Sequence, residues 1–560
     1  MSQRLNSAEY RRTYDPRSVD DPWACHFCEG PVCGQEKWNN MLSKKVRQRL
    51  SSYNLLSHLA VACGAGLLLG AAALWFSPLW TLVALTGGGF IFATLKRPEI
   101  ALLGILIATS SIIFENRLPL IPIGIVGSLH IPDLFLLALF GLIILRWLVE
   151  PDFKIIRTPL DWPLLAFYAV ALLATSIAVF QSSVEFHVAR RMIRVVTYYL
   201  TFFAVTNLVR EDRQLRFLLR GLFLLATIVA VVMIAQFLLG ASLPLLPGRV
   251  ETLYTQGTSY GAITRILPPG QSIMLVAFIA TSVTLVLGKL RPINTLKFLQ
   301  WGLLGLAVVF TFTRSFWVQA SLALFLLACL VKGQDRQRLV GWGLVVLLLA
   351  AIVLLPAFDE PESQATSLVR ASFERLGTLV SGKTLGESSL QWRYVENEYA
   401  LPQIASHPLL GLGLGARYRP FDPRIDHRGM KWDARGYIHN AHLWILMKTG
   451  LLGYLCLVWL SLAFLIRGFR HWRLITNSRM RGCVLGFTLT YLGVLIGAVV
   501  NPMFVQWSWT PVIGIMMGIN EVVLRKVVRE KSGLISAAAS SQSVQGAELE
   551  TNRLIGEGIV

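Results

Sequence analysis

His439 and Asn440 stand at the end of a long polar stretch, directly before the apolar run that begins at Leu443. An unperturbed imidazole is largely neutral near pH 7 and can accept a proton there. His439 is therefore a candidate general base at a membrane edge; from the position alone, an interfacial imidazole that satisfies a loop carbonyl is the favoured interpretation. Asn440 either orients the imidazole or caps the following helix, a position that asparagine favours. His442 is a further candidate for orienting or binding a substrate.

Arginines form the second group of candidate site residues. They gather on the side of the membrane where the Lys/Arg bias does not place them, and a shared anionic ligand would explain this, because guanidinium groups bind phosphate oxygens bidentately. The alternative is that each snorkels to lipid headgroups. The candidates are Arg190, Arg191 and Arg194 in a short outer loop, Arg265 in the next outer loop, and Arg314 at the outer end of a span.

Three arginines of the long polar stretch have two equal interpretations. Arg393, Arg417 and Arg419 could contact the ligand. They could also pair with carboxylates of the same stretch, namely Glu396, Glu398 and Asp422.

No metal or cofactor is expected at this site. No Asp-x-Asp pair or carboxylate cluster lies beside the outer arginines, and a His439/His442 pair has no obvious third ligand. Near the N-terminus, Cys25, Cys28 and Cys33 could hold zinc, but reduced cytosolic thiols are the simpler interpretation.

Composition indicates the scaffold that must position these groups. The chain has 560 residues, of which 54% are hydrophobic and 15% charged. These values exclude a disordered chain, a fibrous repeat and ordinary soluble domains. They predict an all-α, polytopic integral membrane protein of 12–14 transmembrane helices with one long extracytoplasmic loop. The net charge of +20 is typical of basic cytoplasmic loops and does not require nucleic acid.

Apolar runs set the expected spans. These lie at roughly 55–76, 78–95, 99–114, 131–149, 162–180, 195–209, 214–238, 270–288, 298–313, 316–331, 340–357, 443–466, 482–500 and 508–524. Lys and Arg counting places both termini in the cytoplasm, and the first span is expected to be an uncleaved anchor.

The chain therefore divides into five expected parts. They are a cytoplasmic segment over 1–54, spans one to eleven over 55–357, an extracytoplasmic loop over 358–442, the last spans over 443–524 and a disordered cytoplasmic tail over 525–560. Within the long loop, Ser389 to Ser406 predicts an amphipathic helix that ends before Pro408. The alternating glycines from Gly411 to Gly415 then predict a tight backbone element.

The motif around His439 resembles that of bacterial O-antigen ligases. His439 and Asn440 are followed by nine residues, Gly450, two residues and Gly453. Only this resemblance reverses the order of the two interpretations of His439, so that a general base is favoured. Further stretches are similar to the wider O-antigen ligase and polymerase superfamily, and the resemblance covers about residues 180–510. These stretches are Arg190, Arg191 and Arg194 ahead of a span, Thr311 to Ser315, Trp392-Arg393, and His407 to Gly413.

The resemblance implies a glycosyltransferase that moves a glycan from an undecaprenyl-diphosphate carrier to an acceptor hydroxyl on a glycan, a lipid or a protein. It also implies an inner-membrane protein with an extracytoplasmic active site, roles in O-antigen or exopolysaccharide synthesis, and a possible chain-length regulator as partner. In-line attack without a metal predicts inversion at the anomeric carbon. Polymerase, ligase and protein O-glycosylation all remain open.

A lipid-linked glycan flippase or transporter is the alternative from another functional class. Transport needs charged or polar groups along a path through the spans. The predicted span centres are almost free of charge, which favours the transferase.

Overall fold

A computed structural model of the chain describes residues 92–344 and 388–528, apart from gaps at 115–116, 124–126, 289–294, 425–432 and much of 241–262. The chain divides into two compact units, Met1–Phe90 and Ile91–Val560, and every element named below belongs to the second. The expectations for Cys25, Cys28, Cys33, the first span, most of the second, residues 345–387 and the tail beyond 528 lie outside the described residues.

Helices dominate the described part of the chain. In the first half they are α3 (Pro98–Ser110), α4 (Ile131–Val149), α5 (Asp161–Phe180), α6 (Phe186–Thr197), α7 (Thr201–Leu208), α8 (Asp212–Leu239), α9 (Gln271–Leu287), α10 (Thr295–Phe310) and α11 (Arg314–Leu330). In the second half they are α14 (Ser388–Ser406), α15 (Ala441–His471), α16 (Ser478–Gly497) and a helix over 510–528.

Two short antiparallel hairpins accompany the helices. Strand β1 (Ile121–Ile123) pairs with β2 (Gly127–Leu129), and β3 (Val250–Leu253) pairs with β4 (Ile263–Ile266). In the second hairpin Arg265 stands opposite Glu251. Neither hairpin is predicted from the sequence; both lie between apolar helices, where a connection can pair its own backbone groups.

The prediction of an all-α polytopic membrane protein is confirmed. Among the described residues, α4, α5, α8, α15 with its short extension to Leu474, and α16 are long and apolar enough to cross a membrane, and α3, α9, α10 and α11 are shorter apolar helices. Large apolar side chains on these helices are exposed, among them Leu137, Trp147, Phe180, Phe325 and Leu455. Such side chains suit a lipid environment, since acyl chains are as apolar as leucine.

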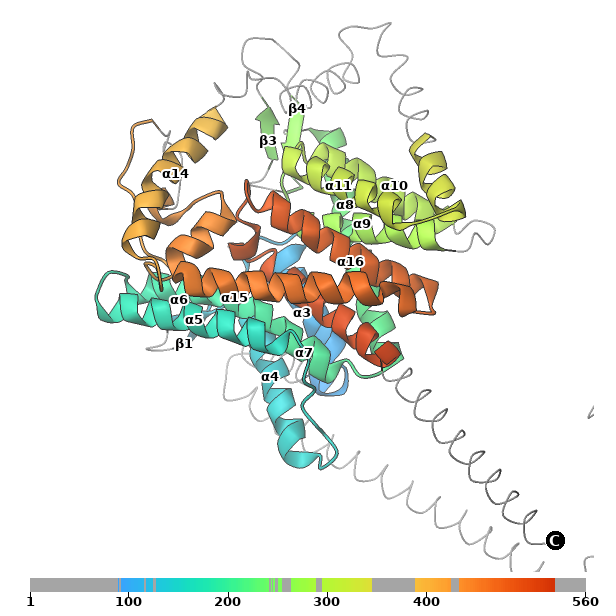
Figure 1. Cartoon of the computed structure of the whole chain (residues 1–560), viewed down its shortest axis with the longest axis horizontal. Helices are drawn as coiled ribbons and strands as arrows, with labels where there is room; N and C mark the ends of the chain where they lie inside the picture. The colour runs from blue at the N-terminus through green and yellow to red at the C-terminus, as the bar shows by residue number, and fades with distance from the viewer. Residues whose placement is uncertain are drawn as a thin grey trace, which may run out of the picture. The chain divides into compact units, whose positions relative to one another are not determined.

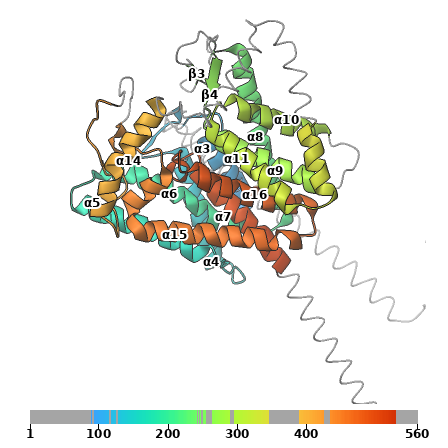
Figure 2. The same ribbon diagram turned by 45° about the horizontal axis from the view of Figure 1, so that its top comes forward.

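The helices form two neighbouring groups that meet at α16. Helix α15 packs along α5, which contacts α6, and α14 packs against α15 (Figure 1). Helix α9 packs against α8, α10 and α16, and α11 also contacts α16 (Figure 2). Helix α16 therefore links the group around α15 to the group around α9.

The predicted span over 195–209 is wrong as a continuous helix. Arg190, Arg191 and Arg194 do not lie in a loop but on α6, which ends at Thr197. A short 3-10 turn, Tyr198–Leu200, then leads into α7. Tyr198 and Tyr199 are buried there, and their hydroxyl groups bond to Asp133 and to the Phe504 carbonyl. These tertiary bonds account for the break.

Helix α15 is interrupted at Gly450, whose φ of 63° and ψ of −171° are not helical. The residues around the break pair with the segment that follows α14. Leu451 N donates to the Pro408 carbonyl (2.7 Å) and Leu412 N to the Met447 carbonyl (2.9 Å). Gly413 N donates to the Lys448 carbonyl (3.0 Å). Backbone groups freed in an apolar environment each cost several kcal/mol when unpaired, so these bonds make the interruption possible.

The glycines of this segment are required because atoms of neighbouring segments approach their Cα atoms closely. A Cβ on Gly450 would overlap the Leu409 carbonyl, and one on Gly411 would overlap the Met447 carbonyl. Gly413 packs in the same way against Ala178 of α5. Residues 408–416, here called the glycine segment, thus tie the break in α15 to the end of α5.

We predict that Gly450→Ala destabilises the protein by more than about 2 kcal/mol, because alanine combines an unfavourable positive φ with a backbone overlap. The apparent unfolding temperature in detergent measures this. Gly302→Ala is the matched control, since Gly302 lies within α10 and a Cβ added there would meet no atom within 4 Å. Equal unfolding temperatures for the two variants would contradict the role given to the break.

Candidate functional site

His439 is held by a buried carboxylate from α14. Its backbone N–H donates to Glu396 Oε2 at 2.8 Å, and its Nδ1 lies 3.0 Å from each carboxylate oxygen. Glu396 is only 1% exposed, whereas the His439 side chain is 22% exposed. Because a carboxylate can only accept, this contact favours the proton on Nδ1, and in a neutral imidazole of that tautomer Nε2 has a lone pair. This is the tautomer that a general base needs at Nε2.

Two aromatic rings restrain the plane of the imidazole. The ring of Trp392 lies 5.4 Å from the His439 ring, and that of Tyr437 lies 4.9 Å away, both nearly perpendicular to it. Trp392 precedes Glu396 by one helical turn on α14, so the same helix supplies both the carboxylate and one of the rings. His439 is therefore oriented on more than one side.

Asn440 and His442 have structural partners. Asn440 is the N-cap of α15, and its side chain accepts from the backbone N–H groups of His442 and Leu443. The two ring nitrogens of His442 lie 2.8 Å from the Leu495 carbonyl and 3.4 Å from the Tyr454 hydroxyl. Asn440 thus caps the helix, one of the two alternatives set out above, and a substrate contact by His442 stays a prediction.

The arginines of α6 differ in their surroundings. Arg194 Nη1 lies 3.7 Å from the carboxylate of Asp133, which also accepts a 2.6 Å hydrogen bond from Tyr198. Arg190 is half-buried and Arg191 is exposed. Asp133 therefore helps to orient the Arg194 guanidinium.

Arg265 contacts the turn between α10 and α11, and Arg314 directly follows that turn. Arg265 Nε donates to the Thr311 carbonyl at 3.3 Å, and Arg314 is the first residue of α11. Between them, Phe312 is buried and has a φ of 45°, which is rare for a bulky side chain. Strained backbone of this kind persists only where its surroundings hold it, and it clusters at functional sites.

The segment after α16, residues 498–505, connects these parts. The Ala498 carbonyl accepts from Ala441 N at the start of α15 (2.8 Å), and Asn501 donates to Ser315 beside Arg314. The ring of Phe504 lies 5.5 Å from that of His442, and its carbonyl accepts from Tyr199 (2.9 Å). The turn before α15, the start of α11 and the end of α6 thus share one neighbour.

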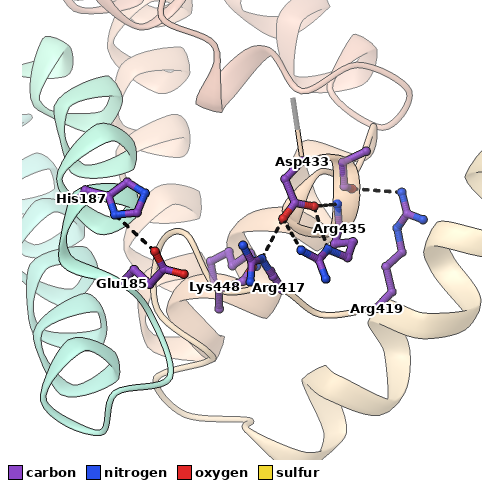
Figure 3. Close-up of polar contacts among 9 residues, drawn as sticks. Glu185, His187, Arg417, Arg419, Asp433, Arg435 and Lys448 are labelled. Atoms are coloured by element: carbon purple, nitrogen blue, oxygen red, sulfur yellow. Dashed lines mark hydrogen bonds and ion pairs between the residues drawn. The ribbon is translucent and has the colours of Figure 1, made fainter. Parts of the chain in front are cut away.

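The arginines of the long loop separate into distinct environments. Arg393 lies on α14 between Trp392 and Glu396. Arg417 is exposed and pairs with Asp433 at 2.7 Å, as does Arg435 at 2.8 Å (Figure 3).

Asp422, one of the carboxylates expected to pair with these arginines, has other partners. It binds Arg424, which also reaches Glu398, and it accepts from Tyr399. Hydrogen bonds from Arg424 hold the pKa of Asp422 well below its usual range. Arg417 pairs with Asp433, and Arg419 donates to the Ala434 carbonyl, so the described contacts of these two arginines do not include the expected pairing with Glu396, Glu398 or Asp422.

Two features of the site are not predicted from the sequence. From the sequence, Glu396 is considered only as a partner for arginines, and Asp133 is given no role. Glu396 and His439 are 43 residues apart, so no local spacing could pair them. Among the described residues, no three His, Cys, Asp or Glu side chains form a set that could hold a metal ion; the expectation of a metal-free reaction stays a prediction.

Comparison with known proteins adds one finding. Residues 301–458 match the family model described as O-antigen ligase, while no curated protein matches the chain. The matched segment holds Arg314, Glu396, the glycine segment, His439 and Gly450, whereas Arg265 and the α6 arginines lie before it. The match confirms the resemblance to the O-antigen ligase and polymerase superfamily.

We predict that Glu396→Ala destabilises the protein by about 1–3 kcal/mol, because the half-buried N–H groups of His439 lose their buried acceptor. The apparent unfolding temperature measures this loss. Glu398→Ala is the matched control two residues away: Glu398 is 51% exposed and pairs with the exposed Arg424. Its removal should cost less than about 1 kcal/mol. A larger loss for Glu398→Ala would argue against the buried pairing.

Proposed function

We propose that this chain, whose residues 301–458 match the O-antigen ligase family, is a glycosyltransferase that moves a glycan from an undecaprenyl-diphosphate carrier to an acceptor hydroxyl. The observation that carries the proposal is the pairing of His439 Nδ1 with the buried Glu396. It leaves Nε2 to accept a proton, as transfer to a hydroxyl requires. The acceptor is a second lipid-linked glycan in a polymerase and a lipid core in a ligase.

The base and the leaving group define the reaction. His439 Nε2 takes the proton of the acceptor hydroxyl while its oxygen attacks the anomeric carbon. The bond from that carbon to the diphosphate oxygen breaks, and the diphosphate leaves with the electron pair. Since attack and departure are in line on opposite faces of the sugar, the anomeric configuration inverts. The imidazolium then returns its proton to water.

Arginines supply the charge that the leaving diphosphate needs. Guanidinium groups donate two parallel hydrogen bonds to phosphate oxygens and stay charged at any working pH. The strongest candidates are Arg194, which Asp133 helps to orient, and Arg265 and Arg314, which both lie at the turn between α10 and α11. Arg190, Arg191 and Arg393 extend the same set. Fixed positive groups of this kind can replace a metal ion at a developing negative charge.

The fold supports a membrane location, since the described chain has several helices that are apolar and long enough to cross a bilayer. We place the protein in the inner membrane with the His439 turn on the extracytoplasmic face and both termini inside. This orientation rests on the Lys/Arg bias of the loops. A polyprenyl-linked glycan can reach such a site laterally through the bilayer.

We predict that His439→Ala lowers the rate of glycan transfer by at least about 100-fold without preventing donor binding, because it removes the base and leaves the arginines. Purified protein is incubated with polyprenyl-diphosphate glycan, and transferred or elongated products are measured. Glu396→Gln should lower kcat more than it changes KM, whereas Glu398→Gln should change neither by more than about twofold.

Two results would argue against this mechanism. Wild-type rates in His439→Ala would show that the imidazole is not the base. Movement of the glycan lipid across a bilayer by the wild-type protein, with no covalent change in the glycan, would identify a flippase instead.

We predict that Arg194→Ala weakens binding of a polyprenyl diphosphate by about tenfold or more, because a charged hydrogen-bond pair is lost. Arg194→Lys should recover only part of the affinity, since lysine lacks the planar fork. The dissociation constants are measured by calorimetry in detergent. Arg213→Ala, on the exposed first turn of α8, is the control and should bind as the wild type does. Full recovery by lysine would mean that simple charge suffices.

A further inference from the structure

Arg419 is a buried cation whose hydrogen-bonding capacity is largely unused. The residue is 4% exposed, and its Nη2 donates to the Ala434 carbonyl at 3.0 Å (Figure 3). Its Nε and Nη1 are also buried, and they hydrogen-bond to nothing in the part of the chain that the structure describes. A guanidinium carries five N–H donors and no acceptor, so the vacant positions can only bind an acceptor.

A buried lysine lies against the same aromatic ring. Lys448 of α15 is 0% exposed, and its Nζ donates to the Ala416 carbonyl. The charged groups of Arg419 and Lys448 lie 5.9 and 5.5 Å from the centre of the Tyr418 ring. Neither forms an ion pair with any described carboxylate. Buried charges without a partner are unfavourable, so this region favours an incoming anion.

Glu396, the carboxylate that acts on Tyr418, already has hydrogen-bond partners. Burial raises the pKa of the Tyr418 phenol, the negative charge of Glu396 raises it further, and the Arg419 guanidinium opposes both. Glu396 and Arg419 therefore both act on Tyr418. The carboxylate of Glu396, however, accepts from the backbone and the ring of His439. Glu396 is therefore committed to His439, and no described carboxylate forms an ion pair with Arg419.

Two contacts link Tyr418, the residue before Arg419, to His439. The Tyr418 hydroxyl donates to the Tyr437 carbonyl at 3.0 Å, and the Tyr437 ring lies 4.9 Å from that of His439. The indole Nε1 of Trp392, whose ring also contacts the imidazole, is buried with no hydrogen-bond partner among the described residues. The vacant groups of Arg419 and Trp392 are both donors, as an oxygen-rich ligand requires.

Arg417 provides the contrast within the same loop. It lies two residues before Arg419 but is 52% exposed and pairs with Asp433. The charge of Arg417 is balanced by Asp433 and exposed to water. The charge of Arg419 is buried and forms no ion pair with a described carboxylate. The two side chains therefore predict different responses to an anionic ligand.

We propose that Arg419 binds an anionic oxygen, from a carboxylate or a phosphate, on the glycan substrate beside His439. The proposal deepens the function proposed above and rests on it for the identity of the substrate as a glycan. Because Arg419 is 4% exposed, an anion can enter only if the Ala434–Gly436 turn that it contacts shifts. Exposed Asp433 and half-buried Arg435 hold this turn from the solvent side.

The test measures binding by the full chain in detergent, without turnover. The probes are a disaccharide that contains glucuronate, its neutral glucose counterpart, and farnesyl diphosphate. We expect Arg419→Gln to weaken binding of at least one anionic probe by about tenfold, and to change binding of the neutral disaccharide by less than about twofold. Arg417→Gln should change binding of the anionic probes by less than about twofold. Loss for glucuronate alone identifies a sugar carboxylate, and loss for farnesyl diphosphate alone identifies the lipid phosphate.

Two results would overturn the proposal. One is an equal effect of Arg419→Gln and Arg417→Gln; the other is an equal effect of Arg419→Gln on the anionic and the neutral probes. If Arg419→Gln does not fold, Arg419→Lys should bind the preferred anion with intermediate affinity, and unchanged affinity would count against a bidentate contact. Absence of glycan transfer by a wild-type protein that still shows Arg419-dependent binding would refute the proposed function alone.

Discussion

Interruption of α15 at Gly450 is the constraint on which the arrangement of the site depends. A broken helix in an apolar environment is stable only if its freed backbone groups find partners, and here the glycine segment supplies them. The same segment packs on the end of α5 through Gly413 and leads directly into Arg417 and Arg419. The break therefore determines where the loop after α14 can run, and with it the position of α14 against α15.

The position of α14 in turn determines the chemistry of His439. Trp392 and Glu396 reach the imidazole from this helix, and the carboxylate directs the proton to Nδ1. Residues 498–505 then connect the start of α15 with Ser315 beside Arg314 and with Tyr199 after α6. His439 and several arginines from distant parts of the sequence thus share one structural support, which is the arrangement that the proposed transfer from a lipid diphosphate needs.

Sequence reasoning located the features that have a local pattern. The apolar run over 131–149 coincides with α4, and the helix predicted from Ser389 to Ser406 is α14 within one residue. The break at Gly450 was not predicted, because the apolar pattern continues across it. The arginines of α6 were placed in a loop, since their helix is too polar to resemble a span. The pairing of Glu396 with His439 joins residues far apart in sequence, and only the fold brings them together.

A structure of the protein with a bound, non-hydrolysable polyprenyl diphosphate sugar would test the central claim most directly. We expect the diphosphate among Arg194, Arg265 and Arg314, and the anomeric carbon within about 5 Å of His439 Nε2, which leaves room for an attacking hydroxyl. The Glu396 carboxylate would remain on Nδ1. A diphosphate bound far from His439, or an imidazole whose Nε2 points away from the sugar, would contradict this mechanism.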